Sequence, residues 1–280
     1  MVSGRTLSFR EALGASRSDT FFRPPCLPPL GQGGLFIIIV YRRARVRGCE
    51  QLNDHKEVPV SNEEALHLAA LADAYRFAGV FLSLPTREVA EGVVSGVASD
   101  DLAAVLSEAA SPEDGARFVD ELSSSAGSDV EETHRALRRD FTRLFTNPEQ
   151  PLVSIYEACF KKADDFDTSQ LTFVSPTALD AERQYRAWGL VVGTEHRESP
   201  DHMGAELDFL SYLYGRAAEG AEHGDAELMR RALEAVAEFR RSHFDKWASG
   251  FFNAVRDRAQ TPAYRAVGEL GILLADGSWQ

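Results

Sequence analysis

The stretch ESPDHMGAELDFL, residues 198–210, holds the side chains of this sequence that are best suited to chemistry. His202 and Glu206 are four residues apart, a spacing that places an imidazole and a carboxylate one helical turn apart, where both can bind one metal ion. A catalytic zinc site usually has three protein ligands, and the sequence has no His-Glu-x-x-His motif. A metal-dependent helical hydrolase therefore requires an unidentified third ligand beside His202 and Glu206.

Other catalytic signatures are missing from the sequence. It contains no Gly-x-Ser-x-Gly elbow for a nucleophilic serine, and Cys159 lies in no recognised local signature with a histidine partner. The glycine-rich piece at 31–34 lacks the lysine and serine of a phosphate-binding loop, so no motif supports nucleotide binding. These observations predict a protein that is not an enzyme and that needs no cofactor.

The helix that carries His202 and Glu206 is predicted to begin at Ser199. Serine is a good N-cap, Pro200 suits the first helical position, and Asp201 places negative charge near the positive end of the helix dipole. The following apolar residues recur at i, i+4, i+7 and i+11 and predict a buried stripe: Met203, Leu207, Leu210 and Tyr214. As a plain structural alternative to a metal site, His202 and Glu206 form a pair on the helix surface.

Helical periodicity extends from residue 58 towards the C-terminus, and no segment alternates apolar and polar residues as a strand does. The predicted helix starts are Ser61, Thr86, Ser99, Ser111, Ser128, Ser154, Ser175 and Ser199. Three further helices are expected over 225–243, 244–260 and 262–275, and prolines interrupt the pattern at Pro85 and at 147–151. The prediction is a single all-α domain of about ten helices over residues 58–280.

Residues 1–57 differ in composition from the rest. They contain nine Lys or Arg against five Asp or Glu, whereas the remaining residues contain 21 against 38. Their apolar run at 35–41 is too short for a bilayer, which needs about 20 residues, and its positive cluster follows rather than precedes it, unlike a secretory signal. We expect a poorly ordered extension, or translated sequence upstream of the natural start.

The net charge of −13 argues against a nucleic-acid-binding protein and favours a cationic partner. Cys26, Cys49 and Cys159 are widely spaced and predict neither a disulfide framework nor a zinc knuckle. Together with the missing export signal, they predict a cytoplasmic protein.

Two segments, in order, resemble the TorD/DmsD/NarJ family of molybdoenzyme maturation chaperones. The first, FTRLFTNPEQPLVSIYE at 141–157, has the family's aromatic-x-x-Leu-Phe segment, a proline-containing loop and Ser-x-Tyr-Glu. The second is the Glu-x-Pro-Asp-His segment that opens a Glu-Leu helix at 198–210, and HFDKW at 243–247 resembles the C-terminal region. The resemblance covers about residues 61–275, and the loop at 147–151 departs from some relatives, which leaves the client enzyme open.

The resemblance implies an all-helical fold and a chaperone that holds a molybdopterin oxidoreductase precursor, often through its twin-arginine signal peptide, until the cofactor is inserted. Such a protein does not insert into the membrane, and it is a monomer or a domain-swapped dimer, with 147–151 as a candidate hinge. The implied peptide-binding residues are Phe141, Leu144, Phe145, Pro200, Asp201, His202 and Glu206. An apolar signal segment would bury against the first three, and its cationic part would meet the others, with Asp201 attracting charge and His202 donating a directional hydrogen bond. Each assignment has a plain structural competitor: Phe141, Leu144 and Phe145 as core residues of their own helix, and Asp201 as a helix cap.

Overall fold

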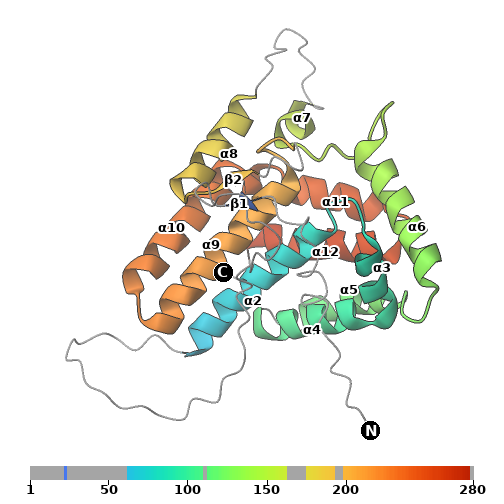
Figure 1. The fold of residues 1–280 in the computed structure, drawn as a ribbon, viewed down its shortest axis with the longest axis horizontal. Helices are drawn as coiled ribbons and strands as arrows, with labels where there is room; N and C mark the ends of the chain where they lie inside the picture. Colours follow the sequence, from blue (N-terminus) through green and yellow to red (C-terminus); the bar gives the residue numbers. More distant parts are fainter. Residues whose placement is uncertain (1–21, 24–61, 110–111, 163–174, 193–197, 278–280) are drawn as a thin grey trace, which may run out of the picture.

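The all-α fold expected from the sequence is confirmed. The computed structural model describes residues 22–23, 62–109, 112–162, 175–192 and 198–277 (Figure 1). Within these residues the chain forms eleven α-helices, labelled α2 to α12, close to the ten that were expected. Among the described helices, none combines the length and the apolar composition that crossing a bilayer requires.

Most of the helices follow one another through short connections. In chain order they are α2 (Asn62–Val80), α3 (Arg87–Ser95), α4 (Val97–Ala109), α5 (Pro112–Ser123), α6 (Val130–Phe141), α7 (Glu157–Lys162), α8 (Pro176–Ala187), α9 (Met203–His223), α10 (Ala226–Ser242), α11 (Ala248–Arg258) and α12 (Pro262–Asp276). A π-helical turn, η1 (Thr142–Thr146), extends α6, and a 3₁₀ turn, η2 (Phe244–Lys246), separates α10 from α11.

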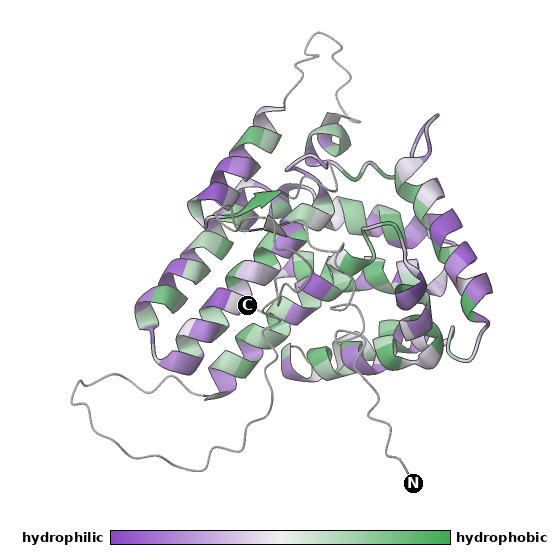
Figure 2. Ribbon diagram, viewed as in Figure 1, coloured by the Kyte–Doolittle hydropathy of each residue, from purple (hydrophilic) through white to green (hydrophobic). Residues whose placement is uncertain are grey.

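Helix α9 passes through the centre of the molecule, between α2 on one side and α10 on the other (Figure 1). The predicted stripe Met203, Leu207, Leu210 and Tyr214 is buried, with at most 2% of each residue exposed. Polar bonds also join α2 to α9, because Arg76 pairs with Asp208 at 2.6 Å and the Ser211 hydroxyl donates to the carbonyl of Ala72. By contrast, α6 at the edge of the molecule is mostly hydrophilic (Figure 2).

Two residues of the predicted N-terminal extension are described, and they pair with the helical region. Strand β1 (Phe22–Arg23) lies antiparallel to β2 (Val191–Val192), with Phe22 opposite Val192. Sequence reasoning expected no strand, since two residues are too few to show an alternating pattern. The other residues of 1–57 lie outside the described ranges, and the boundary at residue 58 stays a prediction.

Several helix starts were predicted correctly from capping residues. Thr86 accepts a hydrogen bond from the amide of Val89, and Ser175 accepts one from Thr177 ahead of Pro176. The helix expected over 225–243 was predicted without a named cap, and in the structure Asp225 caps α10 through the amide of Leu228 at 2.9 Å. Each side chain satisfies an amide that has no partner within its helix, which is why these residue types favour helix starts.

Other predicted starts were wrong by one or a few residues. Ser99 lies inside α4, where its hydroxyl bonds back to the carbonyl of Gly96, and Asp129 rather than Ser128 caps α6. At Asp129 the carboxylate accepts the amide of Glu132, three residues ahead, as an N-cap does. Ser61 and Ser111 lie outside the described residues.

Asp140, at the end of α6, joins this helix to the α11–α12 turn. Its carboxylate is buried and accepts the backbone amides of Gln260 and Thr261 at 2.8 and 2.7 Å, together with the Thr261 hydroxyl at 3.0 Å. Its other oxygen accepts from Arg143 at 2.7 Å. One carboxylate therefore satisfies backbone donors that α12 cannot satisfy itself.

Helices α11 and α12 pack closely because glycines face the neighbouring helix. A Cβ on Gly268 would lie 2.7 Å from the backbone nitrogen of Arg256, and one on Gly271 would lie 2.1 Å from the ring of Phe252. Phe252 is fully buried, so its ring has no free space into which to move. Because glycine has no side chain, Gly268 and Gly271 permit this close contact between α11 and α12.

We predict that Gly271→Ala lowers the free energy of unfolding by about 1–3 kcal/mol, because overpacking outweighs the gain of about 1 kcal/mol in helix propensity. Gly215→Ala is the matched control, since Gly215 lies within α9 and its added Cβ meets no atom within 4 Å. This control should gain up to about 1 kcal/mol. Urea unfolding followed by circular dichroism measures both, and equal effects of the two substitutions would contradict the packing argument.

Candidate functional site

The two sequence segments that resemble a known family lie against each other in the structure. Tyr156 is opposite His202 in an isolated antiparallel bridge. The flanking backbone hydrogen bonds are each 2.9 Å long and run from the amide of Glu157 to the carbonyl of Asp201 and from the amide of Met203 to the carbonyl of Ile155. We call residues 154–157 and 199–203 the paired segments. They are more than 40 residues apart in the chain, so tertiary folding creates this contact.

Helix α9 does not begin at Ser199 as predicted. Residues 199–202 form a turn in which the amide of His202 donates to the carbonyl of Ser199 at 3.0 Å. His202 is the N-cap, and its Nδ1 accepts the amide of Gly204 at 3.0 Å. The ring of Tyr156 packs edge-on against the His202 ring, with centroids 5.3 Å apart. His202 is therefore buried and structural in this state, rather than exposed on a helix surface.

Asp201 caps a different helix from the one predicted. Its Oδ2 accepts the amide of Ala158, in the first turn of α7, at 3.1 Å, and its Oδ1 accepts the Ser199 hydroxyl. The predicted helix start at Ser154 is wrong by a few residues, because α7 begins at Glu157 and the Ser154 hydroxyl donates to the carbonyl of Tyr156. Pro200, which is partly exposed, accepts the Tyr185 hydroxyl at 2.8 Å through its carbonyl.

The apolar wall predicted from Phe141, Leu144 and Phe145 is not an exposed trough. All three side chains are buried, in accord with the competing interpretation that they belong to the core. Phe145 stacks on Phe251 with centroids 6.0 Å apart. The following loop covers the π turn, since the amide of Val153 donates to the carbonyl of Leu144 at 2.8 Å.

Glu206 is fully buried and points to Trp247. The indole N–H of Trp247 lies 3.1 and 3.3 Å from the two carboxyl oxygens. Burial, reinforced by the nearby charge of Glu157, raises the pKa of Glu206 well above its usual value. The carboxyl group therefore favours its protonated form, and the predicted surface pair with His202 is wrong, because both residues are buried.

A buried histidine that sequence reasoning did not single out lies next to Glu206. His243 follows α10; its Nδ1 is 2.8 Å from Glu157, and its Nε2 is 3.0 Å from Asp180. Lys161 donates to the second oxygen of Glu157. Burial alone would raise the pKa of Glu157, but the hydrogen bonds from His243 and Lys161 outweigh it and hold that pKa below its usual value.

The structure changes the partners proposed for a metal ion. Across the described ranges, one group of three or more metal-binding side chains has its ligand atoms all within 4.8 Å of one another: Glu157, Glu206 and His243. We call it the carboxylate–histidine cluster. His202 is not part of this group, and its Nδ1 accepts the amide of Gly204 at the start of α9. Glu157 and His243 both lie in the segments that carry the family resemblance. The only local sequence signal for a role of Glu157 is its i, i+4 spacing from Lys161, which is typical of a helical ion pair.

A small, partly exposed rim lies at the paired segments and includes the preceding residue, Glu198. Tyr156, Glu198 and Pro200 are each partly exposed, and the Tyr156 hydroxyl donates to Glu198. Burial and the hydrogen bond to Glu198 raise the pKa of the Tyr156 hydroxyl, so it remains a donor at neutral pH. The rim thus combines an aromatic ring, a proline and a carboxylate.

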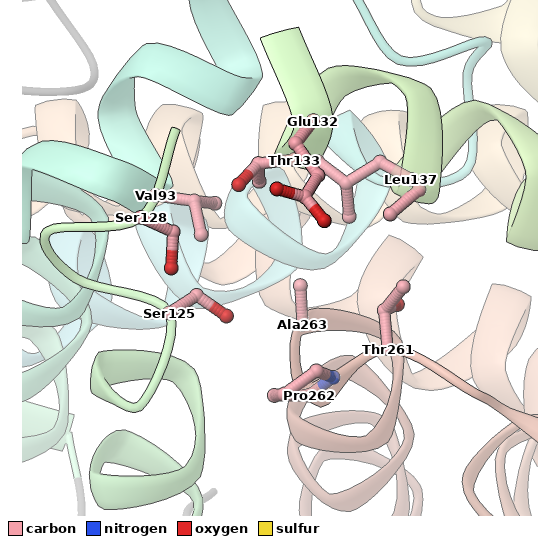
Figure 3. Close-up of a pocket in the computed structure, with 10 residues that line it drawn as sticks. Val93, Ser125, Ser128, Glu132, Thr133, Leu137, Thr261, Pro262 and Ala263 are labelled. Carbon is pink, nitrogen blue, oxygen red and sulfur yellow. The ribbon is translucent and has the colours of Figure 1, made fainter. Parts of the chain in front are cut away.

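A cavity of about 240 Å³ lies elsewhere, between the start of α6 and the start of α12 (Figure 3). Its lining includes Ser128, Glu132, Thr133 and Thr261 and the apolar side chain of Val93. None of the seven predicted peptide-binding residues lines it. The cavity is therefore separate from the paired segments.

Comparison with known proteins agrees with the segments that sequence reasoning selected. The model of a family described as nitrate reductase delta subunit matches residues 108–253, a little more than half of the chain. The match includes both paired segments and all three residues of the carboxylate–histidine cluster. No curated protein matches the chain.

Proposed function

Because the chain belongs to the nitrate reductase delta subunit family, the NarJ/TorD-like molybdoenzyme maturation chaperones, we propose that it binds a molybdopterin oxidoreductase precursor through its twin-arginine signal peptide. In this proposal it works in the cytoplasm and holds the precursor for cofactor insertion before export or assembly. The observation that supports this proposal most directly is the pairing of residues 154–157 with 199–203. This pairing holds the turn at 199–202 in place next to the rim that carries the Glu198 carboxylate.

The rim suits the cationic part of a signal peptide. Glu198 offers a carboxylate beside the Tyr156 ring. An arginine side chain of the peptide can form an ion pair with this carboxylate and stack on this ring. The negative net charge of the chain would steer a cationic peptide towards it, most strongly at low salt. We assign direct contact to the rim, including Pro200, and a positioning role to Asp201, His202 and Glu206, whose bonds fix the turn and the start of α9.

The apolar part of the signal peptide needs an apolar binding surface, and the residues assigned to that surface are buried in this structure. We assign it to Phe141, Leu144 and Phe145, which become accessible when the loop at 147–153 moves away from η1. Two backbone hydrogen bonds hold that loop, and one of them is long: Leu152 to Arg143 at 3.4 Å and Val153 to Leu144 at 2.8 Å. Burying a few such side chains supports affinity on the order of micromolar after ordering costs.

A metal-dependent hydrolase built on His202 and Glu206 has no support in this geometry. His202 caps a helix, and Glu206 is fully buried against Trp247. A maturation chaperone without catalytic chemistry accounts for the same residues as structural supports of a binding turn.

We predict saturable binding when the full-length protein is titrated with a fluorescent twin-arginine signal peptide from a molybdopterin oxidoreductase of the same source. Replacing both arginines of the peptide by glutamine should weaken binding, and added salt should do the same. Glu198→Gln should weaken it about 2–5-fold, as expected for an exposed ion pair. Glu227→Gln, on the exposed face of α10, is the matched control and should have no effect.

Two results would contradict this function. One is equal affinity for the arginine and glutamine peptides, which would mean that the cationic motif is not recognised. The other is the absence of saturable binding to both the signal peptide and the mature oxidoreductase.

A further inference from the structure

We propose that Glu157, Glu206 and His243 form a binding site for one divalent first-row transition-metal ion, of the zinc, manganese, iron or cobalt class. The three side chains come from α7, α9 and the residue after α10, and their ligand atoms lie within 4.8 Å of one another. Metal bonds to carboxylate oxygen and imidazole nitrogen are about 2.0–2.2 Å long, so the ligand atoms of one tetrahedral ion lie about 3.3–3.6 Å apart. Ligand atoms at the 4.8 Å limit therefore have to approach each other by about 1.5 Å when the ion binds.

The donor set fits this class of ion. Two carboxylates and one imidazole combine hard and intermediate ligands, which suit zinc, manganese and iron better than thiolate-preferring ions. All three side chains are buried, with no more than 2% of each residue exposed. Two carboxylates that are closed from water and close together are unfavourable when both are charged, and a dication between them relieves that repulsion.

Asp180 supplies the outer support that metal-binding histidines usually have. It lies 3.0 Å from Nε2 of His243, while Nδ1 faces Glu157. This is the carboxylate–histidine arrangement that fixes the tautomer of a ligand and leaves its other nitrogen to bind the metal. The His243 ring is also stacked on Phe239 with centroids 5.0 Å apart, so its orientation is fixed from two sides.

Lys161 occupies one oxygen of Glu157 and is the internal competitor of the ion. Its side chain is 36% exposed, so the ammonium group can move into solvent when an ion arrives. Asp180 is 37% exposed on the other side of His243, which gives a polar path from solvent to the cluster. An ion bound there would fasten α7, and with it the paired segments, to α9 and to the end of α10.

The test uses the full-length protein, stripped with a chelator and then titrated with Co²⁺ while visible absorption is recorded. We expect one equivalent to bind, Zn²⁺ to displace it, and Glu206→Gln and Glu157→Gln to abolish the saturable signal. Asp180→Asn should weaken binding roughly 10–100-fold, as the loss of an outer-shell partner does. Lys161→Met should tighten it, since the competing cation is gone.

The controls separate the site from adventitious binding. His223→Asn, at the exposed end of α9, and Glu227→Gln, on α10, should leave Co²⁺ affinity unchanged. Circular dichroism is to be used to check that each variant is folded, and Asp180→Asn gives an independent readout because the Asp180 side chain is partly exposed. Two results would overturn the proposal. One is Co²⁺ binding that is unchanged in Glu206→Gln, and the other is the absence of Co²⁺ binding from both the parent protein and Lys161→Met. Neither outcome depends on peptide binding.

Discussion

Asp140→Ala is expected to lower the free energy of unfolding by about 3–5 kcal/mol, because its buried carboxylate accepts two backbone amides, a hydroxyl and the Arg143 guanidinium, and a buried donor left without its acceptor costs about 1–3 kcal/mol. Asp140 is 1% exposed, whereas the Arg143 side chain is 28% exposed, so water compensates part of the lost ion pair but little of the lost backbone acceptor. The substitution removes that acceptor for the amides of Gln260 and Thr261.

The matched control is Asp225→Ala, which removes a carboxylate from an exposed N-cap of α10. An exposed cap contributes about 0.5–2 kcal/mol, since water replaces the lost acceptor. Urea unfolding of both variants, followed by circular dichroism, measures the difference. If Asp140→Ala loses no more stability than Asp225→Ala, then the hydrogen bonds from Asp140 to the α11–α12 turn contribute little to the stability of the fold.

Much of the fold could be predicted because its signals are local. Thr86, Ser175 and Asp225 cap helices as their residue types indicate, and the apolar stripe of α9 needs only helical spacing. Gly268 and Gly271 could not be read in the same way, because their role depends on the neighbouring helix. Local rules therefore identified most helices and left their packing undetermined.

The start of α9 shows why a strong local signal can fail. Ser199, Pro200 and Asp201 satisfy every local rule for a helix start, yet the carboxylate of Asp201 bonds to the amide of Ala158 in α7. The paired segments thus use the capping side chain for a contact between distant parts of the chain. His202 then takes over as the cap, a role for which histidine is not a preferred residue.

Sequence resemblance selected two segments that the structure brings together, and the burial of Phe141, Leu144 and Phe145 agrees with core packing, one of the two interpretations drawn from the sequence. The sequence did not indicate that the following loop would cover them. His243 was missed as the partner of both Glu157 and Asp180, because 86 and 63 residues, respectively, separate it from them. Contacts between residues so far apart in the chain depend on tertiary packing, and the periodic spacing of apolar residues does not predict them.

Phe251→Ala is expected to lower the free energy of unfolding by about 3–5 kcal/mol, because it leaves a cavity in a fully buried site. The ring contacts Phe145, Phe160, Trp247 and Phe252, with centroids 5.0–6.2 Å apart. It therefore connects the apolar residues after α6 with the indole that bonds to Glu206. We expect the substitution to weaken signal-peptide binding as well, since both halves of the proposed site rest on this ring.

Two comparisons isolate the effect of the cavity. Phe251→Leu keeps most of the buried volume and should lose clearly less stability than Phe251→Ala. Phe160→Ala removes a ring that contacts Phe251 and Trp247 in the same cluster but is only partly buried, so it should also cost less. Chemical unfolding and peptide titration of the three variants should rank them in the same order. A Phe251→Ala protein that keeps full stability and full peptide affinity would show that the aromatic cluster does not couple the two segments.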